Sequence, residues 1–207
     1  NDIIEIGEKL STIIHSKKSD KIIIGHDGRN SSLKIKNSLI KTFLKFGIDV
    51  VDISLIPTPI SYFANKTYNI PNVIMITGSH NPKDYNGLKI IIDNKPFFSK
   101  NIKSLNNVET FNLNYPKGAL SFKNPIYPYI ENVLINFNNI KNLKIVWDPG
   151  NGAIGPIINE IVKTIGGQNI ILNKTIDGNF PNHHPDPTLK KNISQVSEYI
   201  QKNKFDL

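Results

Sequence analysis

The sequence contains no cysteine, one methionine and one tryptophan among its 207 residues. A chain without cysteine forms no disulfide and carries out no thiolate chemistry, and such a composition is typical of a cytoplasmic protein. No apolar run approaches the length that spans a bilayer, so we expect no membrane partner. The first residues, NDIIEIGEKL, lack the basic segment and long apolar core of a signal peptide. These absences predict a globular protein of the cytoplasm.

Clustered positive charge is also lacking, although the formal net charge is +8. A protein that binds nucleic-acid backbones usually gathers lysine and arginine on one face or in one run, often with aromatic residues between them. Here the lysines are scattered singly or in pairs, as at Lys17-Lys18 and Lys190-Lys191. This dispersal argues against a nucleic-acid partner. It fits a general attraction for anionic small molecules or a plain compositional preference for lysine.

Short β-branched runs alternate with helical patterns along the chain, which is typical of an α/β fold. Helices are predicted over 3–14, from a cap at Ser31 or Ser32 to about 46, from the end of a Pro-Thr-Pro turn at 57–59 to about 68, over 127–137 and over 155–165. Strands are predicted over 21–26, 49–54, 72–77, 88–93, 143–148 and 168–173. The segment between the third and fourth strands is too short for a parallel crossover. The fourth strand is therefore predicted to pair antiparallel with the third, at the edge of an otherwise parallel sheet.

Two stretches share one pattern, strand–Asp–Gly–helix–Gly–strand, in which the aspartates are Asp27 and Asp148. This echo predicts tandem three-layer α/β domains with mostly parallel mixed sheets. Residues 1–140 would form the first domain and residues 141–207 the second. The sequence lacks an initiating methionine, and its last residues, KFDL, resemble the opening of a strand after a helix. For these reasons the second domain is expected to be incomplete.

The stretch MITGSHNPKDYNGLKI, residues 75–90, places a serine on a punctuated loop at the end of a predicted buried strand. Open α/β sheets bind ligands at such strand ends. Gly78 allows close backbone approach and Pro82 stiffens the exit of the loop. Ser79 is thus either a nucleophile that needs help from a base or its loop, or part of an ordinary polar turn. Lys89 is either a proton-transfer group or a solvated lysine on an edge strand.

A glycine-rich turn, PGNGAIG at 149–155, follows another predicted strand and matches the dinucleotide fingerprint G-x-G-x-x-G. No acidic side chain ends the following strand to hold a ribose, which weakens a nicotinamide site. The segment DGNFPNHHPDP at 177–187 gathers residues that can bind metal: Asp177, His183, His184 and Asp186. Adjacent histidines seldom face one ion, and the three prolines favour a rigid loop instead.

Taken in order, these segments resemble a known family. TGSHNPKDYNGLKI is similar to the phosphoserine loop of the alpha-D-phosphohexomutases, of the phosphomannomutase/phosphoglucomutase type. Further matches are GHDGRNSS (25–32), VVDISLIPTPISYFA (50–64), WDPGNGAIG (147–155) and DGNFPNHHPDPT (177–188). The resemblance covers nearly the whole chain and places it in the N-terminal portion of such an enzyme. His26 stands where relatives often have arginine.

The resemblance implies a four-domain enzyme that interconverts hexose 1-phosphates and hexose 6-phosphates. Ser79 would carry a phosphoryl group, donate it to the sugar, and recover the other phosphoryl group from the resulting bisphosphate. Lys89 matches the family's general acid/base, and His80 lies beside the serine as a further catalytic candidate. Arg29 and Asn81 are expected to bind substrate or phosphate. Hexose phosphates are the implied partners, with a hexose 1,6-bisphosphate as activator.

The resemblance also implies Mg²⁺ bound to an oxygen of the phosphoserine, so that Ser79 is the metal-binding position expected in this chain. The family's Asp-Gly-Asp loop and its third and fourth domains, expected beyond Leu207, would supply the other metal ligands and the sugar contacts. We therefore expect the chain to be inactive alone. The alternative is a non-catalytic sugar-phosphate-binding or interaction protein that keeps the mutase scaffold.

Overall fold

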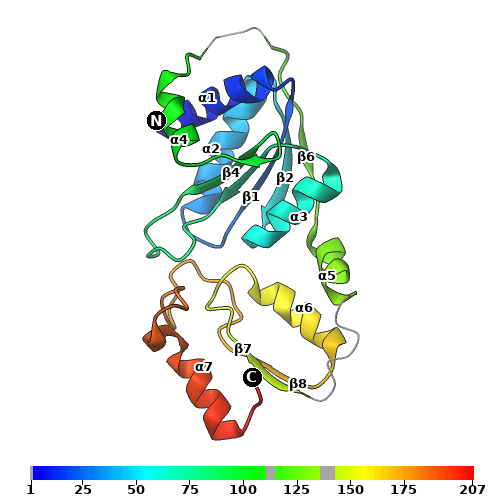
Figure 1. Ribbon diagram of the computed structural model, residues 1–207, viewed down its shortest axis with the longest axis vertical. Helices are drawn as coiled ribbons and strands as arrows, with labels where there is room; N and C mark the ends of the chain where they lie inside the picture. The colour runs from blue at the N-terminus through cyan, green and yellow to red at the C-terminus, as the bar shows by residue number, and fades with distance from the viewer. Residues whose placement is uncertain (1, 111–114, 136–142) are drawn as a thin grey trace. The chain divides into compact units, whose positions relative to one another are not determined.

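The computed structural model describes residues 2–110, 115–135 and 143–207, and these form two compact units (Figure 1). The first unit comprises Asn1–Asp27, Ser31–Thr77 and Gly87–Pro125, and the second comprises Gly28–Asn30, Gly78–Asn86 and Ile126–Leu207. Two short loops that follow strands of the first unit therefore belong to the second unit by their contacts. The predicted domain boundary near residue 140 lies outside the described residues.

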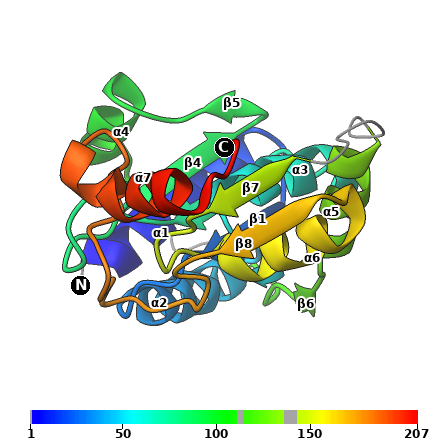
Figure 2. The same ribbon diagram turned by 90° about the horizontal axis from the view of Figure 1, so that it is seen from below.

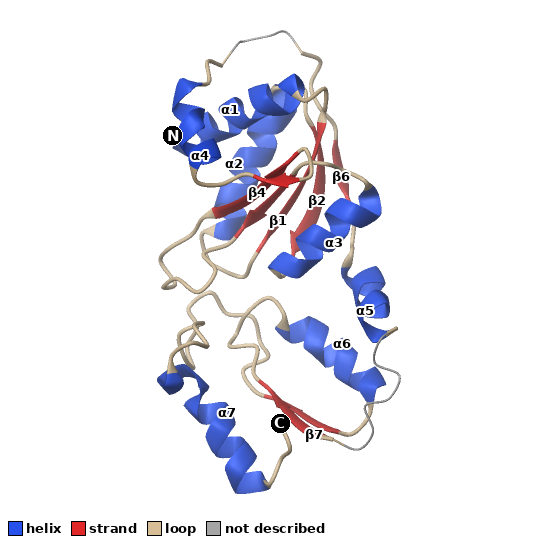
Figure 3. Cartoon of the chain, viewed as in Figure 1, coloured by secondary structure: helices blue, strands red, loops and turns tan. Residues whose placement is uncertain are grey.

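A six-stranded sheet forms the centre of the first unit, in the order β5-β4-β3-β1-β2-β6 (Figure 3). Its strands are β1 (Lys21–His26), β2 (Asp49–Leu55), β3 (Val73–Ile76), β4 (Leu88–Ile92), β5 (Lys95–Pro96) and β6 (Leu120–Phe122). β1 pairs in parallel with β2 and β3, β2 pairs in parallel with β6, and β4 is antiparallel to β3. The predicted mostly parallel mixed sheet is confirmed, and so is the antiparallel direction of the fourth strand. The two-residue β5 lies beyond β4, at the edge of the sheet.

Helices cover both faces of this sheet because successive strand residues point to opposite sides. Helices α1 (Asp2–Ser16) and α2 (Ser32–Lys45) pack on one face, where Ile24 and Ile74 join Leu10 and Phe43 in the core. Helix α3 (Thr58–Tyr68) contacts β1 and β3 from the other side and buries Ile60. The three helices lie close to their predicted positions because each has an apolar stripe at helical spacing.

The segment after β5 contains elements that periodicity did not predict: helix α4 (Lys100–Ser104), the 3₁₀ turn η1 (Leu105–Asn107) and β6. All three residues of β6 are exposed. An edge strand without a buried face shows no alternation of apolar and polar residues, so the sequence carries no signal for it.

The second unit contains a parallel strand pair, β7 (Lys144–Trp147) and β8 (Gln168–Ile171), joined by helix α6 (Gly155–Ile165). Helix α5 (Ile126–Leu134) packs on α6, and helix α7 (Lys190–Asn203) contacts β7. The two strands lie between α6 and α7 (Figure 2). The predicted strand–helix–strand repeat is therefore present.

The last residues, KFDL, were predicted to open a strand; they form no strand but run beside β7. Asp206 N donates a hydrogen bond of 2.9 Å to Lys144 O, and Val146 N donates one of 2.8 Å to Leu207 O. Among the helices of the described residues, none has the length and apolar character needed to cross a bilayer.

Candidate functional site

The serine loop, residues 78–86, leaves β3 and returns to the sheet at β4. At its base, Thr77 N donates a hydrogen bond of 3.0 Å to Gly87 O. Ser79 is exposed and has a φ of +53°, in the left-handed region. A non-glycine residue adopts this conformation at a cost of about 1–3 kcal/mol, and such residues cluster at active sites and ligand clamps. Something in the surrounding structure must therefore hold the loop in place.

Arg29 holds this loop from within. The side chain belongs to a residue that is only 3% exposed, and its guanidinium donates hydrogen bonds to four backbone carbonyls of the loop. The acceptors are Pro82 O at 2.6 Å, Ser79 O at 2.8 Å, Asn81 O at 2.9 Å and Tyr85 O at 3.0 Å. A planar fork of donors suits such a set of acceptors, whereas the single ammonium of lysine does not.

The same packing explains a glycine in the loop. A Cβ on Gly78 would lie 2.6 Å from the guanidinium carbon of Arg29 and 2.6 Å from Tyr85 O. Only a residue without a side chain leaves room for the guanidinium there. Arg29 is also the only arginine in the whole sequence. In a chain otherwise using lysine for its basic residues, that solitary arginine is a sequence signal for a forked interaction. The expected role of Arg29 in binding phosphate stays a prediction beside this observed role in holding the loop.

His80 and Asn81 follow the serine on the exposed side of the loop. His80 Nδ1 lies 3.8 Å from Asp186 Oδ1. Hydrogen bonds from the Thr188 hydroxyl and backbone N–H lower the pKa of Asp186, with a smaller contribution from the nearby His80. The Asp186 carboxylate thus lies beside the imidazole that follows Ser79 in the chain. Asn81 N closes a turn by donating to Gly78 O at 3.0 Å.

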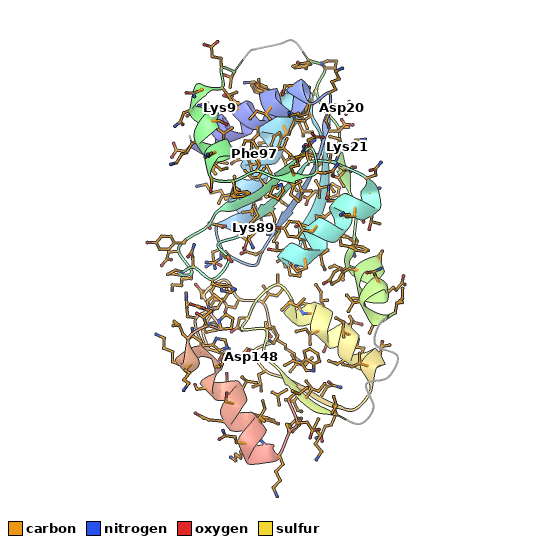
Figure 4. The ribbon with its side chains drawn as sticks, viewed as in Figure 1. Lys9, Asp20, Lys21, Lys89, Phe97 and Asp148 are labelled. Atoms are coloured by element: carbon orange, nitrogen blue, oxygen red, sulfur yellow. The ribbon has the colours of Figure 1, made fainter. Side chains whose placement is uncertain are left out.

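Lys89 comes from β4, in the first unit, where it lies opposite Met75 in the antiparallel pair with β3. Directly opposed residues share a face of the sheet, so Lys89 points to the side that α3 covers. There Lys89, labelled in Figure 4, lines a cavity of about 520 Å³ together with Tyr62 and Asn65 of α3 and with Phe97. Of the predicted site residues, Ser79, His80, Asn81 and Arg29 belong to one unit and Lys89 to the other.

The glycine-rich turn after β7 is occupied by contacts within the protein. Asp148 Oδ1 accepts hydrogen bonds of 2.9 Å from both Gly150 N and Asn173 Nδ2, and its Oδ2 lies 2.8 Å from His183 Nε2 (Figure 4). A Cβ on Gly155 would collide with the carbonyl of Lys174. These glycines are thus required by the turn and by close packing on the chain after β8, whether or not a nucleotide binds.

His183 has a structural role in the second unit. Its Nε2 faces the Asp148 carboxylate and its Nδ1 lies 3.0 Å from the carbonyl of His184. Both ring nitrogens thus lie within hydrogen-bond distance of oxygen atoms. The side chains of His183 and Asp148 are 16% and 10% exposed. His183 therefore ties the DGNFPNHHPDP segment to the turn after β7.

The family resemblance implies Mg²⁺, a hard cation that needs several oxygen ligands. Among the described residues, no group of three or more His, Asp or Glu side chains is placed to hold a metal ion. A magnesium site at Ser79 therefore stays a prediction.

A buried polar cluster in the first unit was not predicted. Lys36 Nζ lies 2.7 Å from Asp52 Oδ2, and the two side chains are 8% and 3% exposed. The signal was a lysine on the apolar stripe of α2, spaced three and seven residues before Leu39 and Phe43. His26 is also buried at the end of β1, and burial lowers its pKa below the ordinary value of 6.5.

Comparison with known proteins places both units in one family. The model of phosphoglucomutase/phosphomannomutase alpha/beta/alpha domain I matches residues 1–110, and the model of domain II matches residues 127–207. A phosphomannomutase/phosphoglucomutase of Pseudomonas syringae is 34% identical over 98% of this chain and 44% of its own length. A phosphopentomutase of Thermococcus kodakarensis is 30% identical over 98% of this chain and 46% of its own length.

A solved structure shows the same fold. The crystal structure of a phosphoglucomutase/phosphomannomutase family protein from Burkholderia thailandensis aligns with a TM-score of 0.88 and 29% identity, over 98% of this chain and 46% of that chain. The chain thus spans about half the length of the curated relatives it matches. The sequence of the serine loop and the two matching domain models point to one family. The chain belongs to the phosphoglucomutase/phosphomannomutase family of alpha-D-phosphohexomutases and corresponds to its N-terminal portion.

Proposed function

We propose that this chain is the phosphoserine-bearing part of a phosphohexomutase that interconverts hexose 1-phosphates and hexose 6-phosphates. The observation that carries the proposal is the exposed Ser79, held at a φ of +53° in a loop whose carbonyls are bound by a buried arginine. Strain maintained by the surrounding structure is common at sites that must present a reacting group.

The proposed step transfers a phosphoryl group between two oxygens. A bond forms between a sugar hydroxyl oxygen and phosphorus while the bond between Ser79 Oγ and phosphorus breaks. The proton of the sugar hydroxyl passes to Lys89 Nζ in its neutral form, and the serine alkoxide takes a proton from solvent water as it leaves. The bisphosphate then turns over and returns its other phosphoryl group to Ser79 by the reverse step. Such reactions depend mostly on positioning and charge stabilisation.

The remaining residues support this step by charge and position. His80, which lies 3.8 Å from Asp186, would donate a hydrogen bond to the phosphoryl group, and Asn81 would donate to its oxygens. Arg29 would orient the loop through its backbone. Mg²⁺, when bound, would stabilise negative charge on the transferred group. Its other ligands would come from outside the described residues.

The substrate class is proposed to be hexose phosphates, with mannose and glucose phosphates favoured by the TGSHNP spelling of the loop. One relative at 30% identity is named a phosphopentomutase, so pentose phosphates belong in the same substrate screen. We further propose that the protein works in the cytoplasm and that the chain alone does not turn over. Sugar recognition in this family would need its third and fourth domains.

The experiment is phosphopeptide mass spectrometry on the natural full-length protein, purified from its source and then incubated with glucose or mannose 1,6-bisphosphate. We expect one phosphoryl group on the peptide that contains Ser79. The Ser79→Ala variant should lose it, whereas Ser38→Ala, which removes an exposed serine hydroxyl on α2, should keep it. A separate turnover assay on the 207-residue chain should give no conversion above that of Ser79→Ala.

A native protein that never carries phosphate on Ser79, even after exposure to these bisphosphates, would overturn the proposal. In that case saturable binding of hexose phosphates, measured by calorimetry, would instead identify a binding protein on the mutase scaffold. Native-like turnover by the 207-residue chain would contradict the expectation that it is inactive alone.

A further inference from the structure

We infer that Phe180, in the second unit, is a positioning residue for the serine loop and acts on it through Arg29. The inference rests on the proposed function of Ser79. It concerns the segment 176–180, which carries the Asp-Gly-Asn-Phe sequence at its end.

The guanidinium that bonds the loop carbonyls also lies over the ring of Phe180. The guanidinium carbon is 5.2 Å from the centre of the Phe180 ring. An arginine over an aromatic face is attracted by the ring's negative potential, and the attraction grows when both groups are shielded from water. The ring therefore contacts the same guanidinium whose N–H groups bond the carbonyls of Ser79, Asn81, Pro82 and Tyr85.

The turn that presents the ring is itself strained. Phe180 has a φ of +49°, which is rare for a bulky residue. The turn is closed by Phe180 N donating to Asp177 O at 3.0 Å and by Asn179 N donating to Asp177 Oδ1 at 2.8 Å. Ser79 and Phe180, both in left-handed conformations, thus contact the same guanidinium. Two strained residues on one buried cation indicate a site whose geometry is specified.

The strained turn is seated directly on the segment that carries Arg29. A Cβ on Gly178 would lie 2.7 Å from Gly28 O and 2.8 Å from Asn30 N. A Cβ on Gly28 would collide with Ile176. Asn30 Nδ2 also donates to Asn179 Oδ1 at 3.2 Å. The turn at 177–180 is therefore packed backbone to backbone against the segment 28–30, with no space for a side chain at either glycine.

These contacts form one stack: the strained turn, the guanidinium and the serine loop. Removing the ring would take away the aromatic contact of the Arg29 guanidinium and weaken its hold on the loop carbonyls. The loop would then leave its strained conformation more often, and Ser79 would be presented less often to a phosphoryl donor. The expected defect is in the maximal rate of phosphoryl transfer, because the sugar-binding residues are unchanged.

The test uses the natural full-length protein and compares Phe180→Leu, which removes the ring, with Phe180→Trp, which keeps one. Tyr199→Leu is the control, because it removes an aromatic pair with Phe205 in the same unit without touching Arg29. The single-turnover rate of phosphorylation of Ser79 by glucose 1,6-bisphosphate should fall roughly 3- to 30-fold in Phe180→Leu, with the half-saturating concentration unchanged. Phe180→Trp and Tyr199→Leu should stay within about twofold of the parent rate.

Amide hydrogen exchange of residues 78–86 gives a readout that does not depend on activity. Exchange should accelerate in Phe180→Leu and not in Tyr199→Leu. If Ser79 of the parent protein accepts no phosphate, the proposed function fails while the exchange result still decides the role of Phe180. Unchanged exchange and an unchanged transfer rate in Phe180→Leu would overturn the inference.

A second variant covers the case in which Phe180→Leu does not fold. Gly178→Ala keeps the ring but pushes the turn away from Gly28 O and Asn30 N. It should accelerate loop exchange in the same residues. Loop exchange equal to that of the parent in a folded Gly178→Ala protein would also contradict the stack described above.

Discussion

Replacing Arg29 by lysine tests the central feature of the site, because it keeps the positive charge and removes the fork. The guanidinium makes four hydrogen bonds to loop carbonyls, at 2.6–3.0 Å, from a residue that is 3% exposed. A lysine ammonium, a compact group on a flexible chain, can replace at most one or two of them. Each bond from a charged donor contributes about 1.5–3 kcal/mol.

Loss of two such bonds should therefore destabilise the closed loop by about 3 kcal/mol, which corresponds to an increase of roughly 100-fold in its opening equilibrium. The assay is amide hydrogen exchange of residues 78–86 in Arg29→Lys, together with phosphopeptide mass spectrometry of Ser79. Lys123→Ala is the control, because it removes a cation that lies 4.3 Å from the Tyr68 ring in the first unit. Loop exchange in Arg29→Lys within threefold of the parent would refute the reasoning.

Three further predictions concern charge in the first unit. Asp52→Asn leaves the buried ammonium of Lys36 without its ion-pair partner and should lower the free energy of unfolding, measured by chemical denaturation, by about 3–5 kcal/mol. The double variant that also carries Lys36→Met should recover most of this lost stability. Burial holds the pKa of the His26 imidazole below 6.5, so the unfolded state binds more protons than the folded state as pH falls below that value. The free energy of unfolding should therefore drop, by about 1.4 kcal/mol per unit of pKa difference. His26→Gln should flatten this dependence of stability on pH. Lys89→Met should slow phosphoryl transfer from phosphoserine to sugar, measured by rapid-quench kinetics, by about 10²- to 10⁴-fold. Circular dichroism should show an unchanged fold. A smaller decrease in rate would reject proton transfer by Lys89.

Local patterns determined most of the elements. The β-branched run at 21–26 and the apolar stripe of α2 identify their own structure because burial of one face requires a fixed spacing. The short connection between β3 and β4 determined their antiparallel pairing, since a parallel crossover needs more residues. Burial imposes no pattern on β6, whose residues are all exposed, so the sequence did not predict this strand.

The chemistry of the site was carried by residues close in sequence, so the loop around Ser79 could be identified from the order of its residues alone. The sequence by itself thus determined the α/β class, the strand pairing near the loop and the family. The tertiary structure alone decided what Arg29 bonds, because its acceptors are carbonyls more than fifty residues away in three cases. It also decided that Phe180, about 150 residues from Arg29, supports the same guanidinium. Backbone carbonyls are the same in every residue, so no pattern of side chains records which of them a buried cation will hold.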